Sequence, residues 1–145
     1  MKKDEVDTFI KSIDTVSHKI DLYVSDQLKD LGLTPSTYFV ILKIGAYGEL
    51  TQEQLFQMLS INPSNVTRRL NRLIEVGYVS KKQSTDDKRR RLVKLTEVGQ
   101  QKFDELYKRM PKLNDTVTQV FDEDEKEILA KLMTKMEANM DELLK

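Results

Sequence analysis

Apolar residues recur at steps of three and four along the amino-terminal part of the chain, with lysines and aspartates between them. The apolar positions are Val6, Phe9, Ile10, Ile13, Val16, Ile20, Tyr23, Val24, Leu28 and Leu31. This spacing follows the helical period of about 3.6 residues and forms a single apolar stripe. The pattern therefore predicts one long amphipathic helix that ends at Gly32.

Three shorter helices follow, and each begins with a capping signal. The signals are Thr34-Pro35, the pair Thr51 and Gln54, and Asn62-Pro63. A capping side chain, with proline at the first helical position where one is present, is typical of helix starts. We expect the first of these helices to end at Gly45 and Gly48, and the third to end at Gly77.

The second and third of these helices, residues 51–59 and 63–76, are joined by a tight turn and form a predicted helix-turn-helix. After Gly77 the helical period stops. Residues 78–84 and 91–96 read as two short strands on either side of the polar tip 85–90, which predicts a hairpin with an extended loop. A helix-turn-helix followed by such a hairpin is a winged helix.

From Thr96 onward the helical period returns and predicts two more helices. The first carries Phe103, Leu106, Tyr107, Met110, Leu113, Val117, Val120 and Phe121, and Pro111 in its middle predicts a kink. Asp122 and Glu125 form a capping pair for the second. That helix carries Ile128, Leu129, Leu132, Met133, Met136, Met140, Leu143 and Leu144. The methionines of this helix could form a ligand-binding stripe or could pack in a core or a dimer interface. Their helical spacing favours packing.

Both ends of the chain thus carry long amphipathic helices, and a module of residues 34–96 is too small to cover both apolar stripes. Pairing with a second copy of the chain would bury the remainder, so we expect a homodimer. A monomeric helical bundle remains the alternative. The predicted fold is mainly α with a small β-hairpin wing. It is one domain, 1–145, with a winged helix at 33–96 flanked by dimerisation helices at 1–32 and 97–145.

The composition narrows the possible chemistry. The absence of cysteine excludes disulfides, zinc ribbons, iron–sulfur clusters and thiol catalysis, and one histidine argues against a transition-metal site. A carboxylate site for a hard cation stays open. The longest run free of polar groups, Phe39–Leu42, is far below the roughly 20 residues that span a bilayer. The amino terminus, Met1-Lys2-Lys3-Asp4-Glu5, turns acidic at once and lacks an apolar signal region, so we expect a cytoplasmic protein. We also expect no cofactor.

The formal net charge is zero, but the charges are not evenly distributed. The window 68–94 holds ten basic and three acidic residues, a net +7, and the rest of the chain holds −7. A run of charge is most often a solvated surface. Charge of one sign confined to the second helix and the wing of a winged helix instead favours DNA binding, because Lys and Arg there meet backbone phosphates.

The second helix of the helix-turn-helix separates into two faces. At about 100° per residue, Val66, Leu70 and Leu73 point together toward the core, and Arg68 points directly away. Ser64, Asn71 and Arg72 flank Arg68, with Thr67 and Arg69 on the shoulders. We expect Ser64, Asn65 and Arg68 to lie nearest the base edges of a major groove, and Arg72 to reach phosphate. For Arg69, an ion pair with Glu75 or a wing acid is the equal alternative.

The wing tip carries Lys88 followed by three consecutive arginines, Arg89, Arg90 and Arg91. Like charges at a hairpin end repel each other and add no stability. The arginine side chains instead fit the minor groove of DNA, which is narrow and negative and favours inserted arginine. Asp87 opposes this use unless it orients the Arg89 guanidinium through a short ion pair, as we expect.

Together these segments resemble the multiple antibiotic resistance regulator (MarR) family of winged-helix transcription factors. The most specific match is Asp87-Lys88-Arg89-Arg90-Arg91-Leu92-Val93-Lys94-Leu95-Thr96-Glu97-Val98-Gly99. The supporting segments are Leu33-Thr34-Pro35-Ser36, Ser64-Asn65-Val66-Thr67-Arg68 and Leu73-Ile74-Glu75-Val76-Gly77-Tyr78-Val79. These segments occur in the family's order and spacing, and the similarity as a whole covers almost the entire chain.

The resemblance implies a homodimeric repressor joined by its terminal helices, with two winged helices on a pseudo-palindromic DNA operator. It implies that Arg89 enters the minor groove and that Asp87 holds it. Many members are released by a small aromatic or phenolic anion, and the matching lining here would be His18, Tyr38, Leu42, Tyr47 and Tyr107. Ordinary packing is the alternative for each, with His18 a partly buried, hydrogen-bonded histidine. Without cysteine the chain cannot sense peroxide as some members do, and its single histidine argues against the zinc-sensing branch.

Two other functions compete with DNA binding. A winged helix can serve as a protein–protein interaction module without DNA readout, but this predicts an apolar or mixed face in place of Ser64, Arg68, Asn71 and Arg72. An enzyme would need a nucleophile with an activating base or a phosphate-binding glycine loop, and the sequence offers neither. We therefore expect a DNA-binding regulator with no catalytic residues.

Overall fold

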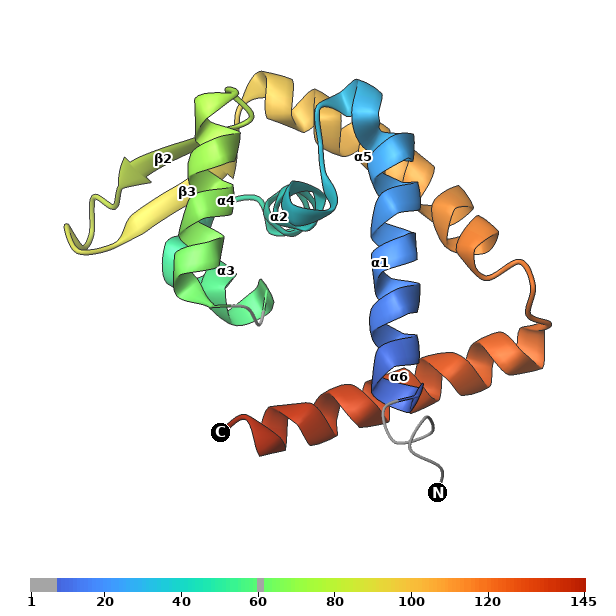
Figure 1. The fold of residues 1–145 in the computed structure, drawn as a ribbon. Helices are drawn as coiled ribbons and strands as arrows, with labels where there is room; N and C mark the ends of the chain where they lie inside the picture. The colour runs from blue at the N-terminus through green and yellow to red at the C-terminus, as the bar shows by residue number, and fades with distance from the viewer. Residues whose placement is uncertain (1–7, 60–61) are drawn as a thin grey trace. The chain divides into compact units, whose positions relative to one another are not determined.

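The computed structural model describes residues 8–59 and 62–145 (Figure 1). Val6 of the first predicted helix lies outside the described residues. The chain divides into two compact units, one up to Met110 and one from Pro111 to Lys145. The first unit contains the winged helix, the first long helix and most of the fifth.

The structure is mainly helical with a small antiparallel sheet, which confirms the predicted fold class. Its elements are α1 Thr8–Leu28, η2 Lys29–Leu31, α2 Pro35–Tyr47, β1 Leu50–Thr51, α3 Gln52–Leu59, α4 Pro63–Glu75, β2 Val79–Gln83, β3 Arg91–Leu95, α5 Glu97–Val117 and α6 Glu123–Leu143. The first predicted helix ends at Gly32, as expected, but its last turn, η2, is a 3₁₀ turn. The proline predicted to kink the fifth helix, Pro111, lies inside α5, which continues to Val117.

The predicted capping signals form the contacts that start the helices. The backbone N–H of Thr51 donates to Gln54 Oε1 at 2.9 Å, and the N–H of Gln54 donates to Thr51 Oγ1 at 3.1 Å. Asn62 Oδ1 accepts the N–H of Ser64 at 2.9 Å, and Thr34 caps α2. Asp122 and Glu125 form the reciprocal pair that opens α6. These bonds satisfy donors that the first helical turn leaves free, which is why local sequence suffices to predict them.

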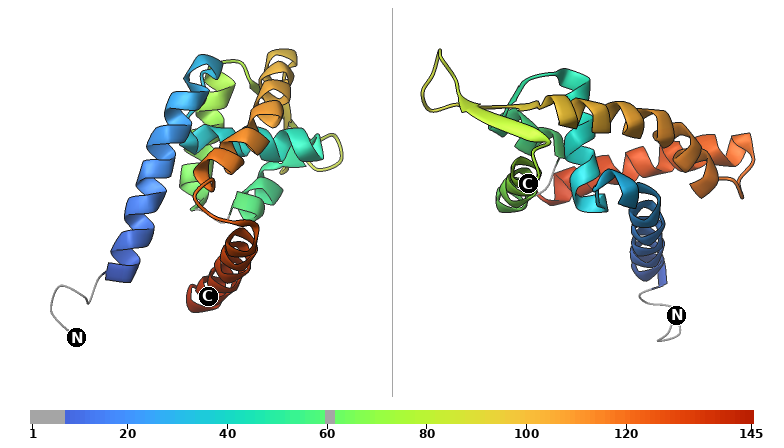
Figure 2. Two further views of the ribbon diagram at one scale, coloured as in Figure 1. Left: turned by 90° about the vertical axis from the view of Figure 1, so that its right-hand side faces the viewer. Right: turned by 90° about the horizontal axis from the view of Figure 1, so that it is seen from above.

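The sheet has three strands in the order β1-β3-β2, one more than the predicted hairpin. In β1 only Leu50 and Thr51 pair with β3, opposite Val93 and Leu92. Two residues are too short to show an alternating pattern, so the sequence alone could not reveal this strand. The loop between β2 and β3 projects away from the surrounding helices (Figures 1 and 2).

The core of the first unit joins side chains from each of its long elements. Fully buried apolar residues come from α1, α2, α3, α4, β3 and α5, namely Leu28, Val40, Ile41, Ile44, Leu55, Val66, Leu70, Leu73, Val93 and Leu106. Because α4 contributes three of them, its opposite face is fixed outward. The core therefore determines which side chains of α4 can meet a ligand or partner.

Gly45 does not end α2, contrary to expectation. The helix continues to Tyr47, and Gly48 caps it with its N–H bonded to the carbonyl of Ile44 at 2.7 Å. A Cβ on Gly45 would lie 2.0 Å from Cδ2 of Phe103, so the ring of Phe103 occupies the space that a side chain would need. The glycine serves close packing of α5 on α2, a contact that the local sequence does not show.

The base of the wing is fixed to the start of α5 by Thr96. Thr96 Oγ1 accepts the N–H of Gly99 at 3.0 Å and donates to the carbonyl of Gly77 at 2.6 Å, while the Thr96 N–H donates to the carbonyl of Tyr78 at 3.1 Å. Gly77 has φ +84°, a left-handed conformation that glycine adopts without strain and that stops α4. One threonine thus joins the end of α4, the first wing strand and α5.

Long apolar faces remain exposed on two helices. In α1, every residue from Thr8 to Lys19 is exposed, including Phe9 at 66% and Ile10 at 75%. In α6, none of the residues is buried, and Leu132 is 52% exposed. No helix in residues 8–59 and 62–145 is long and apolar enough to cross a membrane. Apolar faces of this length favour association with another protein surface.

Candidate nucleic-acid interface

Helix α4 presents the two faces that its sequence predicts. Val66, Leu70 and Leu73 are buried, whereas Arg68 on the opposite side is exposed. The residues expected around Arg68 follow the same division: Ser64, Asn71 and Arg72 are exposed, and Asn65, Thr67 and Arg69 are half-buried. The exposed face of α4 therefore carries cationic and amide side chains that can bond to base edges and phosphates.

Short contacts hold the first turns of this face. Ser64 Oγ donates to Asn62 Oδ1 at 2.6 Å, and Thr67 Oγ1 donates to the carbonyl of Pro63 at 3.0 Å. Arg68 Nη2 donates to Asn65 Oδ1 at 2.5 Å. The Arg68 guanidinium is thereby held along the helix toward its amino-terminal end, the end that enters the groove in helix-turn-helix docking.

The alternative for Arg69, an ion pair with Glu75 or a wing acid, is not found among the described residues. Glu75 Oε2 lies 3.7 Å from Nη1 of Arg72, one helical turn before it, and both side chains are largely exposed. A pair three residues apart lies on one side of a helix, whereas Arg69 is six residues away on a different side. An exposed pair of this kind contributes at most about 1 kcal/mol, so Arg72 can exchange Glu75 for a phosphate.

The wing loop is an ordered turn. The buried Ser84 accepts the backbone N–H groups of Asp86 and Asp87 at its Oγ, at 3.2 and 3.4 Å, and its own N–H donates to the carbonyl of Arg90 at 3.0 Å. Gln83 Nε2 donates to the carbonyl of Lys88. These contacts place Lys88, Arg89, Arg90 and Arg91 at the exposed tip and the start of β3.

The prediction that Asp87 pairs with the Arg89 guanidinium is wrong. Asp87 Oδ1 accepts the backbone N–H of Arg89 at 3.0 Å, and Asp87 Oδ2 lies 3.9 Å from Nε of Arg90. The turn brings the side chain of Arg90, three residues after Asp87, beside the carboxylate. Among the described residues, Arg90 is the only one of the three consecutive arginines that forms an ion pair, so Asp87 orders the loop through the backbone of Arg89.

Gln52 links the wing to α4, a role that the sequence does not indicate. Its Oε1 accepts from Nζ of Lys81 on β2 at 3.3 Å, and its Nε2 lies 3.4 Å from Thr67 Oγ1 on α4. Strand β2, which carries Lys81, and helix α4, which carries Thr67, are therefore neighbours in space. A glutamine directly after the capping residue Thr51 carries no signal of this contact, because its two partners lie 15 and 29 residues away.

A cavity of about 370 Å³ lies beside the basic face of α4. Its polar lining consists of Arg68, Arg69 and Arg72 from α4 and the hydroxyl residues Thr34, Ser36 and Thr37 from the start of α2. Three arginines around one cavity favour an anionic occupant. The sequence signalled Thr34 and Ser36 only as a helix start, so their place beside the basic face comes from the tertiary structure.

The five residues expected to line an effector pocket do not line this cavity. Tyr38 is buried, with its ring centroid 4.1 Å from that of Phe39, and Leu42 is half-buried. Tyr47 and Tyr107 are 61% and 67% exposed. His18 is exposed, like every other residue of α1 before Ile20, so the single chain does not show the alternative of a partly buried histidine.

Burial, together with the negative charge of Asp21, raises the pKa of Tyr38 to about 12. Because the folded protein holds this proton more tightly than the unfolded chain, the free energy of unfolding should fall as the pH rises from about 10 toward 12. We expect a loss of about 2 kcal/mol across that range. Tyr38→Phe should remove this loss in urea unfolding experiments, and Tyr47→Phe, at an exposed tyrosine, should retain it. An equal loss in wild type and Tyr38→Phe would contradict the assignment.

Known proteins are similar to this chain in both sequence and architecture. The model of the MarR family matches residues 33–91. Over 97 residues the chain is 32% identical to YwoH of Bacillus subtilis, an uncharacterized HTH-type transcriptional regulator, covering 67% of this chain and 70% of YwoH. It is also 26% identical over 95 residues to the HTH-type transcriptional repressor MdtR of Bacillus subtilis, covering 66% of this chain and 61% of MdtR.

The structure superimposes on a mutant MarR of Escherichia coli that was crystallised with operator DNA. The TM-score is 0.85 at 28% sequence identity, and the match covers 92% of this chain and 96% of that protein. The shared region includes the winged helix and extends well into the flanking helices.

Proposed function

The chain belongs to the MarR family of transcriptional regulators, and we propose that it is a homodimeric repressor that binds a pseudo-palindromic DNA operator in the cytoplasm. The observation that carries this proposal is the exposed face of α4, with Arg68 and Arg72 outward, beside a wing that ends in three arginines. The operator complex of the E. coli MarR and the repressor name of MdtR support it.

Each group of residues has a distinct proposed role at the DNA. Arg68, with Ser64, Asn65, Thr67 and Asn71 around it, reads base edges in the major groove. Arg72 contacts a phosphate and fixes the position of α4 on the duplex. The wing residues Lys88, Arg89, Arg90 and Arg91 reach the adjacent minor groove and its phosphates. The cavity between α2 and α4 belongs to the same basic surface, because the three arginines of α4 line it.

Selection of bound sequences from a random DNA pool tests this proposal. We expect a two-fold symmetric site with half-sites about one helical turn apart. Arg68→Ala should then cost roughly 1 to 3 kcal/mol on the selected operator and relax the base preference at one position in each half-site. Asn71→Ala replaces another side chain of the same exposed face. It is the variant with which Arg68→Ala is compared in the test of base preference at individual positions. Recovery of no enriched sequence would refute sequence-specific binding, and an unaltered preference would show that Arg68 does not read bases.

The dimer is proposed to form through the terminal helices, residues 1–32 and 97–145, outside the winged helix of residues 33–96. Its support is the exposed apolar face of α1 and the wholly unburied α6. Apolar faces on two helices supply the self-complementary patches that a two-fold dimer needs.

Removal of α6 should therefore abolish the dimer. A chain that ends after Phe121 is expected to sediment as a monomer at concentrations where the full chain is dimeric. Leu132→Glu tests the same point with the chain length unchanged, because it places a charge within the apolar stripe. Lys131→Glu, at an exposed position outside the apolar stripe, should leave the dimer intact. A dimer that survives both the truncation and Leu132→Glu would place the interface elsewhere.

The effector is proposed to be a small aromatic or phenolic anion bound beside His18, Tyr38, Leu42, Tyr47 and Tyr107 in the dimer. Exposed Tyr47 and Tyr107 supply aromatic surface and hydroxyl groups for such a ligand. Salicylate is a suitable probe, since it carries both a phenol and a carboxylate. Release of operator DNA by salicylate that Tyr107→Ala weakens would support this site, and release that Tyr107→Ala leaves unchanged would exclude it.

A further inference from the structure

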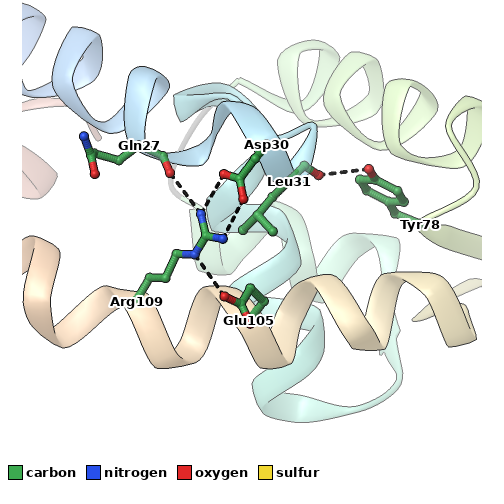
Figure 3. Close-up of polar contacts among 6 residues, drawn as sticks. All are labelled: Gln27, Asp30, Leu31, Tyr78, Glu105 and Arg109. Carbon is green, nitrogen blue, oxygen red and sulfur yellow. Dashed lines mark hydrogen bonds and ion pairs between the residues drawn. The ribbon is translucent and has the colours of Figure 1, made fainter.

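The connection between α1 and α2 is held from two sides by residues far away in the sequence (Figure 3). On one side, Arg109 of α5 donates from Nη1 to Asp30 Oδ1 at 2.7 Å and from Nη2 to Asp30 Oδ2 at 2.6 Å. On the other side, Tyr78 Oη donates to the carbonyl of Leu31 at 2.9 Å. The adjacent residues Asp30 and Leu31 thus join the body of α5 to the base of the wing.

Arg109 makes more contacts than a surface ion pair requires. Its Nη1 also donates to the carbonyl of Gln27 at 3.1 Å, and its Nε donates to Glu105 Oε1 at 3.2 Å. A bidentate pair fixes the orientation of the guanidinium, and a cation beside the last carbonyls of α1 is favoured by the helix dipole. The hydrogen bonds from Arg109 hold the pKa of the Asp30 carboxyl below its ordinary value. Arg109 therefore fixes both the end of α1 and the turn after it.

A shift of this connection would reach the DNA-reading elements directly. A Cβ on Gly32 would lie 2.7 Å from Tyr78 Oη, so the turn and the tyrosine are in close contact. Tyr78 precedes β2, and its carbonyl is bonded to the N–H of Thr96. Gly32 and Thr34 also line the cavity beside the arginines of α4. The turn between α1 and α2 therefore supports both the base of the wing and the wall of the cavity that faces α4.

We propose that Arg109 is a positioning residue for DNA binding, which acts through Asp30 to hold the winged helix at a fixed place relative to α1. This inference rests on the proposed function, because α1 carries one of the apolar faces proposed for the dimer. In a two-fold dimer, the place of each winged helix relative to α1 sets the separation of the two α4 helices. That separation must match the half-site spacing of the operator.

The proposal predicts a loss of spacing discrimination when Arg109 is replaced. Tyr78 still contacts Leu31 in Arg109→Gln, so the winged helix should remain folded but occupy a wider range of positions. Wild type should lose about tenfold in affinity when one base pair is inserted between the half-sites of the selected operator. Arg109→Gln should distinguish the two operators by less than about threefold. Lys108→Gln removes the same charge from an exposed neighbour and should behave as wild type.

A distance measurement tests the same point without DNA. Because the chain contains no cysteine, Gln57→Cys on an exposed position of α3 gives one spin label per protomer. Pulsed electron resonance should show a narrow distance distribution between the two labels in the wild-type and Lys108→Gln backgrounds, and a broader one in Arg109→Gln. If Arg109→Gln fails to fold, Arg109→Lys, which keeps the charge but not the bidentate pair, should show the intermediate width.

The outcomes separate this inference from the proposed function. Unchanged distances together with unchanged spacing discrimination in Arg109→Gln, or in Arg109→Lys if it replaces that variant, would overturn the positioning role. A loss of affinity that is equal on both operators, with unchanged distances, would also overturn it, because it indicates a contribution to stability alone. A wild-type dimer that selects no DNA would refute the proposed function, and the label distances would still decide the role of Arg109. A monomeric wild type would overturn both.

Discussion

Replacement of Gly99 by alanine should destabilise the folded chain by about 3 kcal/mol or more, a large share of the stability of a typical domain. A Cβ at this position would lie 1.9 Å from the carbonyl oxygen of Tyr78 and 2.8 Å from its carbonyl carbon. These are backbone atoms, so no side-chain rotation can relieve the clash. The Tyr78 carbonyl also accepts the N–H of Thr96, and its displacement would break the junction between the wing and α5.

The measurement is the free energy of unfolding in urea, with Gly48→Ala as the matched control. Gly48 has φ +84°, but a Cβ there would meet no atom within 4 Å. Gly48→Ala should therefore lower the free energy of unfolding by only about 1 kcal/mol, because alanine is strained in the left-handed backbone conformation. Equal stabilities of the two variants would show that α5 can move away from Tyr78 at little cost.

Replacement of Arg89 by alanine should weaken binding to every DNA sequence and reduce its dependence on salt. A cation that neutralises one phosphate releases about one counterion, so a dimer without two such arginines should lose about 2 from the slope of log K against log salt. We expect an affinity loss on the order of tenfold to a hundredfold at moderate salt. The Arg89 guanidinium is the one expected to enter the minor groove.

Two variants make this test specific. Arg90→Ala should have a smaller effect, because Arg90 must exchange its ion pair with Asp87 before it can contact DNA. Lys112→Ala removes a positive charge outside the basic window and should leave the slope unchanged. The wing assignment fails if Arg89→Ala retains the wild-type affinity and slope, or if Lys112→Ala matches its effect.

Local patterns predicted much of the proposed interface. The alternation of buried Val66, Leu70 and Leu73 with outward Arg68 follows from the helical period, which depends only on neighbouring residues. The helix starts at Thr51 and Asn62 were equally predictable, because a capping side chain bonds to a backbone N–H two or three residues away. Such features lie within one or two turns of chain, where sequence spacing and spatial distance agree.

Other features depend on contacts that cross the chain. Gly45 reads as a helix stop, yet it lies inside α2 because the ring of Phe103 occupies the place of its side chain. Asp87 was expected to orient the Arg89 side chain, but the turn geometry places Arg90 beside the carboxylate instead. At both positions, the role that is commonest for the residue type differs from the role that its spatial neighbours impose.

The sequence by itself determined the fold class, the helix starts, the two faces of α4 and the concentration of positive charge in residues 68–94, because each depends on spacing and composition along the chain. Only the tertiary structure decided that β1 joins the sheet, that Gln52 links Lys81 to Thr67, and that hydroxyl residues of α2 face the arginines of α4. It also revealed the pair of Arg109 with Asp30, 79 residues apart. Contacts at such separations depend on how packed helices align their side chains, and no periodic pattern in the chain encodes that alignment.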